Sequence, residues 1–171
     1  MLGPVVVASC IMPKDSMIEG VNDSKKVSEK KRERVYEEII KTSVSHGVGI
    51  IDETKIDEIN ILQATKLALT NSIKELQIMP DIILVDALKN INTCGVPYRS
   101  IIKGDAICYS ISAASIIAKV TRDRIMIGYD KIYPEYGFAK HKGYGTAEHI
   151  SAIKKYGLCP IHRRSFVKNI L

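Results

Sequence analysis

The 171 residues are 46% hydrophobic and 26% charged, a composition that is typical of one globular domain and predicts a single domain over residues 1–171. No apolar run approaches the roughly 20 residues that a membrane-spanning helix needs, so a membrane partner is excluded. The net charge of +6 is compatible with a polyanionic partner. Four cysteines without a C-x-x-C pair suggest neither a zinc site nor a disulfide framework and fit a reducing cytoplasm, and a monomer is expected.

The first part of the chain alternates apolar runs with an amphipathic stretch, a pattern that is typical of an α/β fold. Val5 to Ile11 and Val44 to Ile51 are predicted strands. Between them, Ser28 is a good N-cap for a helix. The residues of that helix that form one apolar stripe are Val35, Tyr36, Ile39 and Ile40.

The second part continues the same alternation. Ile82 to Val85 is entirely apolar, which predicts a strand buried on both faces. A further strand is expected around Ser100 to Lys103. The predicted helices of this part are Ile56 to Gln77, Ser110 to about Tyr129, and one that starts after Thr146 and stops near Gly157.

Two carboxylates follow predicted strands. Asp86 comes directly after Ile82 to Val85, and Asp105 follows the next strand along the chain. Because the carboxyl ends of neighbouring strands meet at one edge of an open α/β sheet, both acids are expected there, where ligands bind. Hard oxygen ligands suit Mg²⁺ or Mn²⁺, and such ions assist phosphodiester hydrolysis. The alternative is that each aspartate only caps a turn or a helix.

Two basic stretches are candidates for phosphate contacts. Asn22 to Lys26 places the hydroxyl of Ser24 and the ammonium groups of Lys25 and Lys26 just ahead of a helix, although a solvated loop would explain them as well. The helix from Ser110 is rich in small residues, which indicates close packing against a sheet. Close packing does not explain its basic end, which carries Lys119 and Arg122.

Tyr144 lies between Gly143 and Gly145, just before a predicted helix. A tyrosine ring in such a loop can stack on a sugar or base, and the alternative is that it only fills a packing gap. The four histidines show no ligand spacing such as H-x-x-x-H. They are therefore predicted to be surface or phosphate-adjacent residues rather than metal ligands.

Seven segments together resemble the ribonuclease HII family, in the family's order and over nearly the whole chain. These are Asn22 to Lys26, Ile56 to Ala64, Leu84 to Asp86, Lys103 to Asp105, Ser112 to Asp123, Tyr136 to Thr146 and Pro160 to Phe166. The resemblance implies a ribonuclease H-like mixed sheet flanked by helices and dependence on Mg²⁺ or Mn²⁺. It also implies cleavage of RNA in RNA/DNA hybrids and at single ribonucleotides in DNA.

The resemblance also assigns roles to individual residues. Asp86 and Asp105 match two of the family's four metal-binding acids, and Tyr144 matches the tyrosine that reads the ribose at the junction. Lys25, Lys26 and Lys119 match positions lining the nucleic-acid channel. The 2′-hydroxyl is the group that distinguishes RNA from DNA at such a site.

The sequence departs from the family pattern at its start. Family members open with a strand ending in Asp-Glu and a Gly-Arg-Gly turn, whereas this chain matches from Gly3. We therefore expect a sheet that lacks its first central strand, with a gap between Val5 to Ile11 and Ile82 to Val85 rather than direct pairing. With two of the four acids, activity is expected to be impaired.

Two other functions remain open at this point. The chain could be a catalytically inactive remnant that only binds nucleic-acid duplexes through its basic residues. A different metal nuclease of the same broad fold, such as a resolvase or integrase, is disfavoured by the matches at Asp23 to Lys26 and Lys142 to Thr146.

Overall fold

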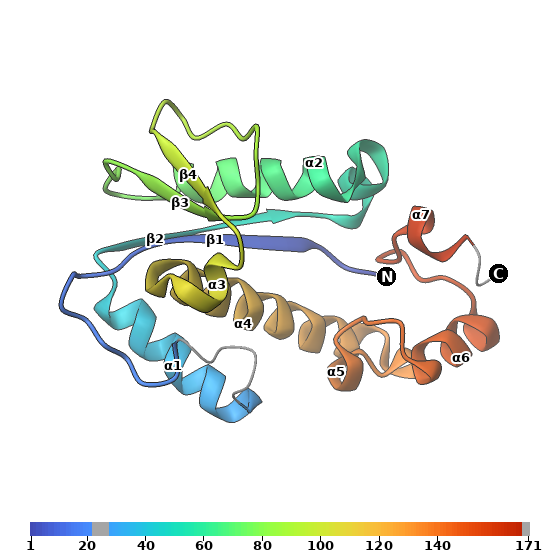
Figure 1. Ribbon diagram of the computed structural model, residues 1–171. Helices are drawn as coiled ribbons and strands as arrows, with labels where there is room; N and C mark the ends of the chain where they lie inside the picture. The colour runs from blue at the N-terminus through green and yellow to red at the C-terminus, as the bar shows by residue number, and fades with distance from the viewer. Residues whose placement is uncertain (22–27, 169–171) are drawn as a thin grey trace. The chain divides into compact units, whose positions relative to one another are not determined.

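The computed structural model, drawn in Figure 1, describes residues 1–21 and 28–168. The chain forms two compact units. Unit 1 comprises Met1–Val5, Ile51–Ala64 and Thr121–Leu171, and unit 2 comprises Val6–Ile50 and Thr65–Val120. That residues 1–171 form a single domain stays a prediction. The elements are β1 (Val5–Ile11), α1 (Glu29–Thr42), β2 (Ser45–Ile51), α2 (Glu53–Lys74), β3 (Ile83–Asp86), β4 (Tyr98–Ile101), α3 (Gly104–Ile107), α4 (Tyr109–Ile132), η2 (Pro134–Tyr136), α5 (Phe138–His141), α6 (Ala147–Tyr156) and α7 (Arg164–Val167).

In unit 2, β1 pairs with β2. The N–H of Val44, just before β2, donates to the carbonyl of Ile11 at the end of β1 over 2.8 Å, so the two strands run in opposite directions. Helix α1 begins where predicted, because the hydroxyl of Ser28 accepts from the N–H of Lys31. Its stripe packs with β1 and α4 in a core of Ala8, Val21, Val35, Ile39, Ala113, Ile116, Ile117 and Val120.

Helix α2 lies very close to β2. A Cβ added at Gly49 would stand 1.8 Å from the carbonyl oxygen of Ala68, so no side chain fits there. The hydroxyls of Ser9 in β1 and Ser72 in α2 are 2.7 Å apart. Helix α2 therefore rests on the backbone of the β1–β2 pair, on the glycine face of β2.

Strands β3 and β4 form a second pair, parallel, with Asp86 opposite Ile101. Ile83 and Val85 pack on α2 with Leu69 and Ile73. Leu84, between them, is 37% exposed. The prediction that this strand is buried on both faces is therefore wrong for one face.

The expected gap in the sheet is confirmed. In the described part of the chain, β1 pairs only with β2 and β3 only with β4, and no ladder joins β1 to β3. A cavity of about 370 Å³, lined by β1, β3, α2 and α4, lies between them in unit 2. This cavity explains the exposure of Leu84, since none of the strands in the described residues covers that face of β3.

Helix α2 contains a break that the sequence pattern did not predict. Asn60 has φ 68 and ψ 164, values outside the helical region. Its Oδ1 accepts from the N–H groups of Leu62 and Gln63 at 3.0 and 3.1 Å, so the side chain caps a second helical segment. The apolar spacing continues through the break, so the sequence pattern predicts one helix over Ile56 to Gln77 although the backbone is interrupted at Asn60.

The core of unit 1 contains Leu2, Met126, Tyr136, Phe138, Ala152, Cys159 and Ile161. Helix α6 starts after Thr146, as predicted, because the hydroxyl of Thr146 accepts from the N–H of His149. Within residues 1–21 and 28–168, none of the helices has the length and apolarity to cross a membrane.

Replacing Gly49 by alanine should lower the free energy of unfolding by about 1–3 kcal/mol, because a methyl group would overlap the backbone of α2. The matched control is Gly128→Ala in α4, where a Cβ would meet nothing within 4 Å. That change should raise stability by about 0.5–1 kcal/mol through helix propensity. Urea unfolding measures both, and an unchanged midpoint for Gly49→Ala would contradict the close packing of α2 on β2.

Candidate metal and nucleic-acid site

The carboxylates of Asp86 and Asp105 both follow the parallel pair of strands at its carboxyl edge. Asp86 ends β3, and Asp105 lies in the first turn of α3, just after β4. The N–H of Gly104 donates to Oδ1 of Asp86 over 2.8 Å, which ties the start of α3 to the end of β3. The end of β3 and the start of α3 therefore meet at one edge of the strand pair, as the sequence predicts.

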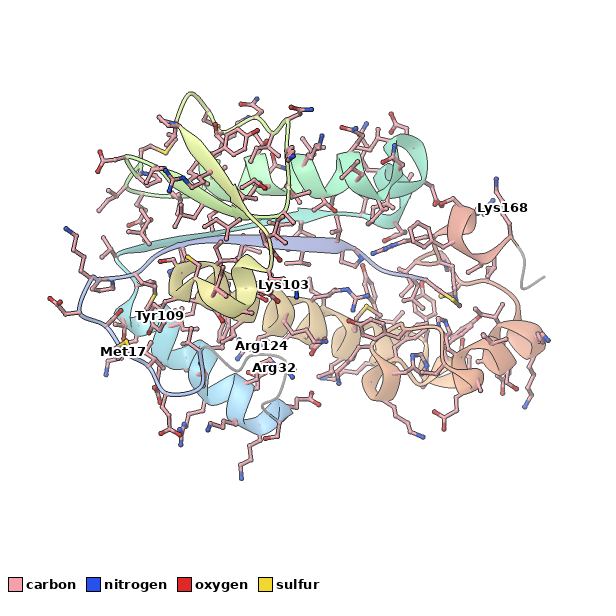
Figure 2. The ribbon with its side chains drawn as sticks, in the orientation of Figure 1. Met17, Arg32, Lys103, Tyr109, Arg124 and Lys168 are labelled. Carbon is pink, nitrogen blue, oxygen red and sulfur yellow. The ribbon has the colours of Figure 1, made fainter. Side chains whose placement is uncertain are left out.

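The turn between β4 and α3 depends on an unusual backbone. Lys103 has φ 56 and ψ 38, the left-handed region, and Figure 2 shows it where β4 passes into α3. A Cβ at Gly104 would lie 2.6 Å from Cδ1 of Ile111, the end of a side chain that would have to shift, and at an ordinary contact distance of 3.4 Å from Cα of Asp86. Lys103 and Gly104 therefore form the turn that leads from β4 to Asp105 in the first turn of α3.

The donor set fits a hard divalent cation in kind, because it offers carboxylate oxygens. Asp86 is exposed and Asp105 half-buried, so both are within reach of solvent ions. Asp86 also has the capping role that was the alternative interpretation, since one of its oxygens accepts from Gly104. Among the described residues there is no group of three or more His, Cys, Asp or Glu that could hold a metal ion.

In unit 1, Arg122 and Tyr144 lie together. The guanidinium of Arg122 is 5.5 Å from the centroid of the Tyr144 ring and donates to the carbonyl of Lys142 over 2.9 Å. A longer bond of 3.4 Å goes to the carbonyl of Leu2. Arg122 therefore positions the loop of Tyr144, a role that its place in the sequence did not reveal.

The ring of Tyr144 is 57% exposed, so it does not fill a packing gap. The sequence suggested that a sugar could approach beside this ring, but side chains of this chain occupy the space next to the two flanking glycines. A Cβ at Gly145 would stand 2.8 Å from the sulfur of Met1, and one at Gly143 would stand 3.0 Å from Cγ of Leu2. In this chain the two glycines make room for the first two side chains.

For three of the four histidines, the prediction of surface or phosphate-adjacent residues is wrong as regards the surface. His141, His149 and His162 are 8%, 0% and 3% exposed and form a cluster behind the Tyr144 loop. Nδ1 of His149 lies 2.9 Å from the carbonyl of Tyr144, and its Nε2 lies 3.2 Å from Nε2 of His162. Nδ1 of His162 is 3.1 Å from the sulfur of Cys159. The histidines do not recur at helical spacing, so the sequence pattern did not indicate that these three side chains are buried.

The basic C-terminal residues are only partly available to a polyanion. Arg163 is 7% exposed and donates to the carbonyls of Gly3 and Pro4 at 2.8 and 3.1 Å. Burial lowers the pKa of Arg163 to about 10. Arg164 is exposed, and its N–H donates to Asp57 over 2.6 Å. Arg163 thus fastens the segment before β1 to the C-terminal part of unit 1.

The other predicted phosphate contacts are placed only in part. Lys119 lies half-buried on α4 in unit 2. Ser24, Lys25 and Lys26 fall outside the described residues. Their roles remain predictions.

Comparison with known proteins gives one consistent result. A family model described as ribonuclease HII matches residues 1–169. The ribonuclease HII of Ruminiclostridium cellulolyticum is 57% identical over 171 residues, which are 99% of this chain and 66% of that protein. The crystal structure of ribonuclease H2 from Pyrococcus horikoshii OT3 superposes with a TM-score of 0.79 at 26% identity, covering 99% of this chain and 90% of that one. Ribonuclease HII of Archaeoglobus fulgidus, solved in complex with PCNA, gives 0.77 at 26% identity, with the same coverage.

The buried histidines predict an acid-sensitive fold. Burial lowers the pKa of His149 from 6.5 to about 4, so the unfolded chain takes up a proton at a higher pH than the folded chain. Stability is therefore full above about pH 6.5 and falls as the pH drops toward 4, by roughly 2–4 kcal/mol. Urea unfolding at a series of pH values measures the loss.

His149→Asn keeps a donor for the carbonyl of Tyr144 and should remove most of this dependence on pH. The control is His46→Asn, because His46 lies outside the cluster and contacts Ser43 instead. A wild-type chain that is equally stable at pH 7 and pH 5 would show that the cluster does not carry the predicted cost.

Proposed function

This chain belongs to the ribonuclease HII family, and we propose that it acts in the endonucleolytic hydrolysis of RNA joined to DNA. The substrates would be RNA/DNA hybrids and duplex DNA with single embedded ribonucleotides. The chain spans 66% of the length of the R. cellulolyticum relative, so the whole protein's activity is part of this proposal. One observation carries it, the convergence of Asp86 and Asp105 at the carboxyl edge of β3 and β4.

We assign Asp86 and Asp105 to the binding of Mn²⁺ or Mg²⁺ through their carboxylate oxygens. Such cations, when bound, activate a water molecule and stabilise the leaving oxygen of a phosphodiester. The chain's own contribution is to orient the acids. The bond from Gly104 holds one oxygen of Asp86, and the left-handed turn at Lys103 starts the helix that carries Asp105.

For nucleic-acid binding we assign Lys119, Arg122 and Tyr144, together with Ser24, Lys25 and Lys26. The exposed ring of Tyr144 supports stacking on a sugar, and Arg122 lies 5.5 Å from the ring centroid and donates to the carbonyl of Lys142 in the same loop. Ribose selection would require contact with the 2′-hydroxyl. A monomeric state and a cytoplasmic location remain predictions from the sequence.

A second function, duplex binding without cleavage, is favoured by one observation. Two carboxylates at the edge are a small donor set for a pair of cations about 4 Å apart, and no larger set occurs among the described residues. We therefore expect the 171 residues to bind Mn²⁺ weakly and to cleave slowly.

The metal assignment predicts the effect of removing each charge. Asp86→Asn and Asp105→Asn should each weaken Mn²⁺ binding at least tenfold, because a charged oxygen ligand is lost. Asp86→Asn keeps an oxygen for the N–H of Gly104, so the turn should survive. Titration calorimetry with MnCl₂ measures the binding, and incision of a duplex with one ribonucleotide measures the activity.

The control is Asp81→Asn, an exposed acid outside this edge. It should change neither quantity. Equal Mn²⁺ affinity in all three variants would refute the metal assignment, and robust incision by Asp86→Asn would refute the proposed chemistry. Robust incision by the unsubstituted chain would refute the expectation of slow cleavage.

Phosphate contact predicts a salt-dependent affinity. Binding to a hybrid duplex should weaken as KCl rises, and Lys119→Ala should make the slope of log affinity against log salt shallower by roughly 0.7–0.9. Fluorescence anisotropy measures both, with Lys74→Ala, an exposed lysine of α2 in the same unit, as the control. A slope that Lys119→Ala leaves unchanged would remove this residue from the interface.

A further inference from the structure

Two buried histidines of unit 1 bond to the backbone around Tyr144. The N–H of Gly143 donates to Nδ1 of His141 over 3.2 Å. Nδ1 of His149 lies 2.9 Å from the carbonyl oxygen of Tyr144. The rings of His141 and His149 stack, with centroids 4.7 Å apart and an interplanar angle of 16°. The backbone that carries Tyr144 is therefore bonded on both sides to one pair of stacked imidazoles.

The position of the Tyr144 ring depends on this backbone. Lys142 and Gly143, the two residues before it, have φ values of 49 and 80, in the left-handed region. Lysine seldom adopts this region, so the surrounding contacts must hold the loop in shape. The ring is 57% exposed, so packing contributes less to its placement than the loop backbone does. Groups that hold the amides and carbonyls of this loop therefore hold the ring.

The carbonyl of Tyr144 determines which nitrogen of His149 carries the proton. A carbonyl oxygen only accepts hydrogen bonds, so Nδ1 of His149 must be protonated. The other nitrogen of a neutral imidazole is then bare, which makes Nε2 of His149 an acceptor. It lies 3.2 Å from Nε2 of His162, which must therefore donate.

The contacts on the far side of His162 require the same arrangement independently. The N–H of Cys159 donates to Nδ1 of His162 over 3.0 Å, so Nδ1 is bare and the proton is on Nε2. Nδ1 also lies 3.2 Å from the carbonyl of Cys159, a contact that would need the opposite tautomer. That carbonyl already accepts from the backbone N–H of His162 at 3.1 Å. The opposite tautomer would set two N–H groups against each other at Cys159 and leave two bare nitrogens facing each other between the rings.

This alternation of donors and acceptors needs both rings to be neutral. Burial lowers the pKa of His149 to about 4, and burial also lowers the pKa of His162. Both imidazoles are therefore neutral at pH 7, each with one donor and one acceptor nitrogen.

We propose that His149 is a positioning residue for Tyr144 in ribose recognition, and that His162 holds His149 in the Nδ1-protonated form that this role needs. One chain of hydrogen bonds runs from the N–H of Cys159 through both rings to the carbonyl of Tyr144. His149 is 0% exposed, so it acts through the loop and not by touching nucleic acid. The inference rests on the proposed contact of Tyr144 with the ribose.

The tautomers can be observed directly in the full 171-residue chain. Long-range ¹⁵N–¹H correlation spectra at pH 7 distinguish protonated from bare ring nitrogens. His149 should be protonated at Nδ1 and bare at Nε2, and His162 should show the reverse. A proton on Nε2 of His149 would overturn the proposal, because that ring could not donate to the carbonyl of Tyr144.

A matched pair of variants tests whether the donor matters beyond the space that the ring fills. Asparagine and leucine have nearly the same shape, but only the amide nitrogen of His149→Asn can replace Nδ1 as a donor. The amides of Tyr144 and Thr146 bond within this loop, to the carbonyls of His141 and Tyr144. Their hydrogen exchange should speed up at least about fivefold in His149→Leu and stay within about twofold of the unsubstituted chain in His149→Asn.

Nucleic-acid binding tests the link to ribose recognition. Fluorescence anisotropy compares a duplex that contains one ribonucleotide with the same duplex made entirely of DNA. His149→Leu should lose the preference for the ribonucleotide to the extent that Tyr144→Ala does, and His149→Asn should keep it. Affinity for the all-DNA duplex should be the same in both His149 variants, because phosphate contacts do not involve this loop carbonyl.

Three results would overturn the proposal, each in a different way. Equal exchange rates in His149→Asn and His149→Leu would show that the ring only fills space. An equal loss of affinity for both duplexes in His149→Leu would show general destabilisation. An unsubstituted chain that binds both duplexes alike would remove the ribose contact of Tyr144 itself, and the exchange rates distinguish that failure from a failure of positioning.

A second pair of variants applies if His149→Leu does not fold. The amide nitrogen of His162→Gln can replace Nε2 as the donor to His149, whereas His162→Met has a similar length and no donor. The Nδ1-protonated form of His149 and the slow exchange of the Tyr144 amide should persist in His162→Gln and be lost in His162→Met. The same behaviour in both variants would show that His162 does not set the tautomer.

Discussion

The candidate site depends on the parallel pairing of β3 with β4. Because the two strands run in the same direction, the residues that follow them meet at one edge, and Asp86 lies opposite the last residue of β4. The N–H of Gly104 then completes the arrangement by bonding to the carboxylate of Asp86. Asp86 at the end of β3 and Asp105 just after β4 thereby follow neighbouring strands at the same edge.

The parts of the fold that follow from local sequence could be predicted. Ser28 and Thr146 cap helices because a side-chain oxygen three residues from an N–H is a local arrangement. The place of Asp86 was predictable too, since an apolar run ending in an acid defines a strand end. The family resemblance added the gap in the sheet, because a missing central strand leaves its neighbours specified by their own packing.

Other features depend on contacts that a single sequence does not display. Arg122 turns toward the Tyr144 loop because the carbonyl of Lys142 lies there, 20 residues further along the chain. Asn60 interrupts α2 through its own side chain while the apolar spacing continues, so periodicity alone had no means to mark the break. The histidine cluster combines residues from α5, α6 and the segment before α7, each of which looked like a polar surface residue.

Burial has a consequence for the chemistry of two thiols, those of Cys159 and Cys10. Burial raises the pKa of the Cys159 thiol to about 11, and burial raises that of Cys10 in β1 to about 12. Since the thiolate is the reactive form, both groups should react slowly with alkylating agents and oxidants while the protein around them is folded. Cys159 belongs to unit 1 and Cys10 to unit 2. The rate at which each cysteine is alkylated therefore reports how often its own unit opens. Comparing the alkylation rates of Cys159 and Cys10 tells whether the two units unfold together.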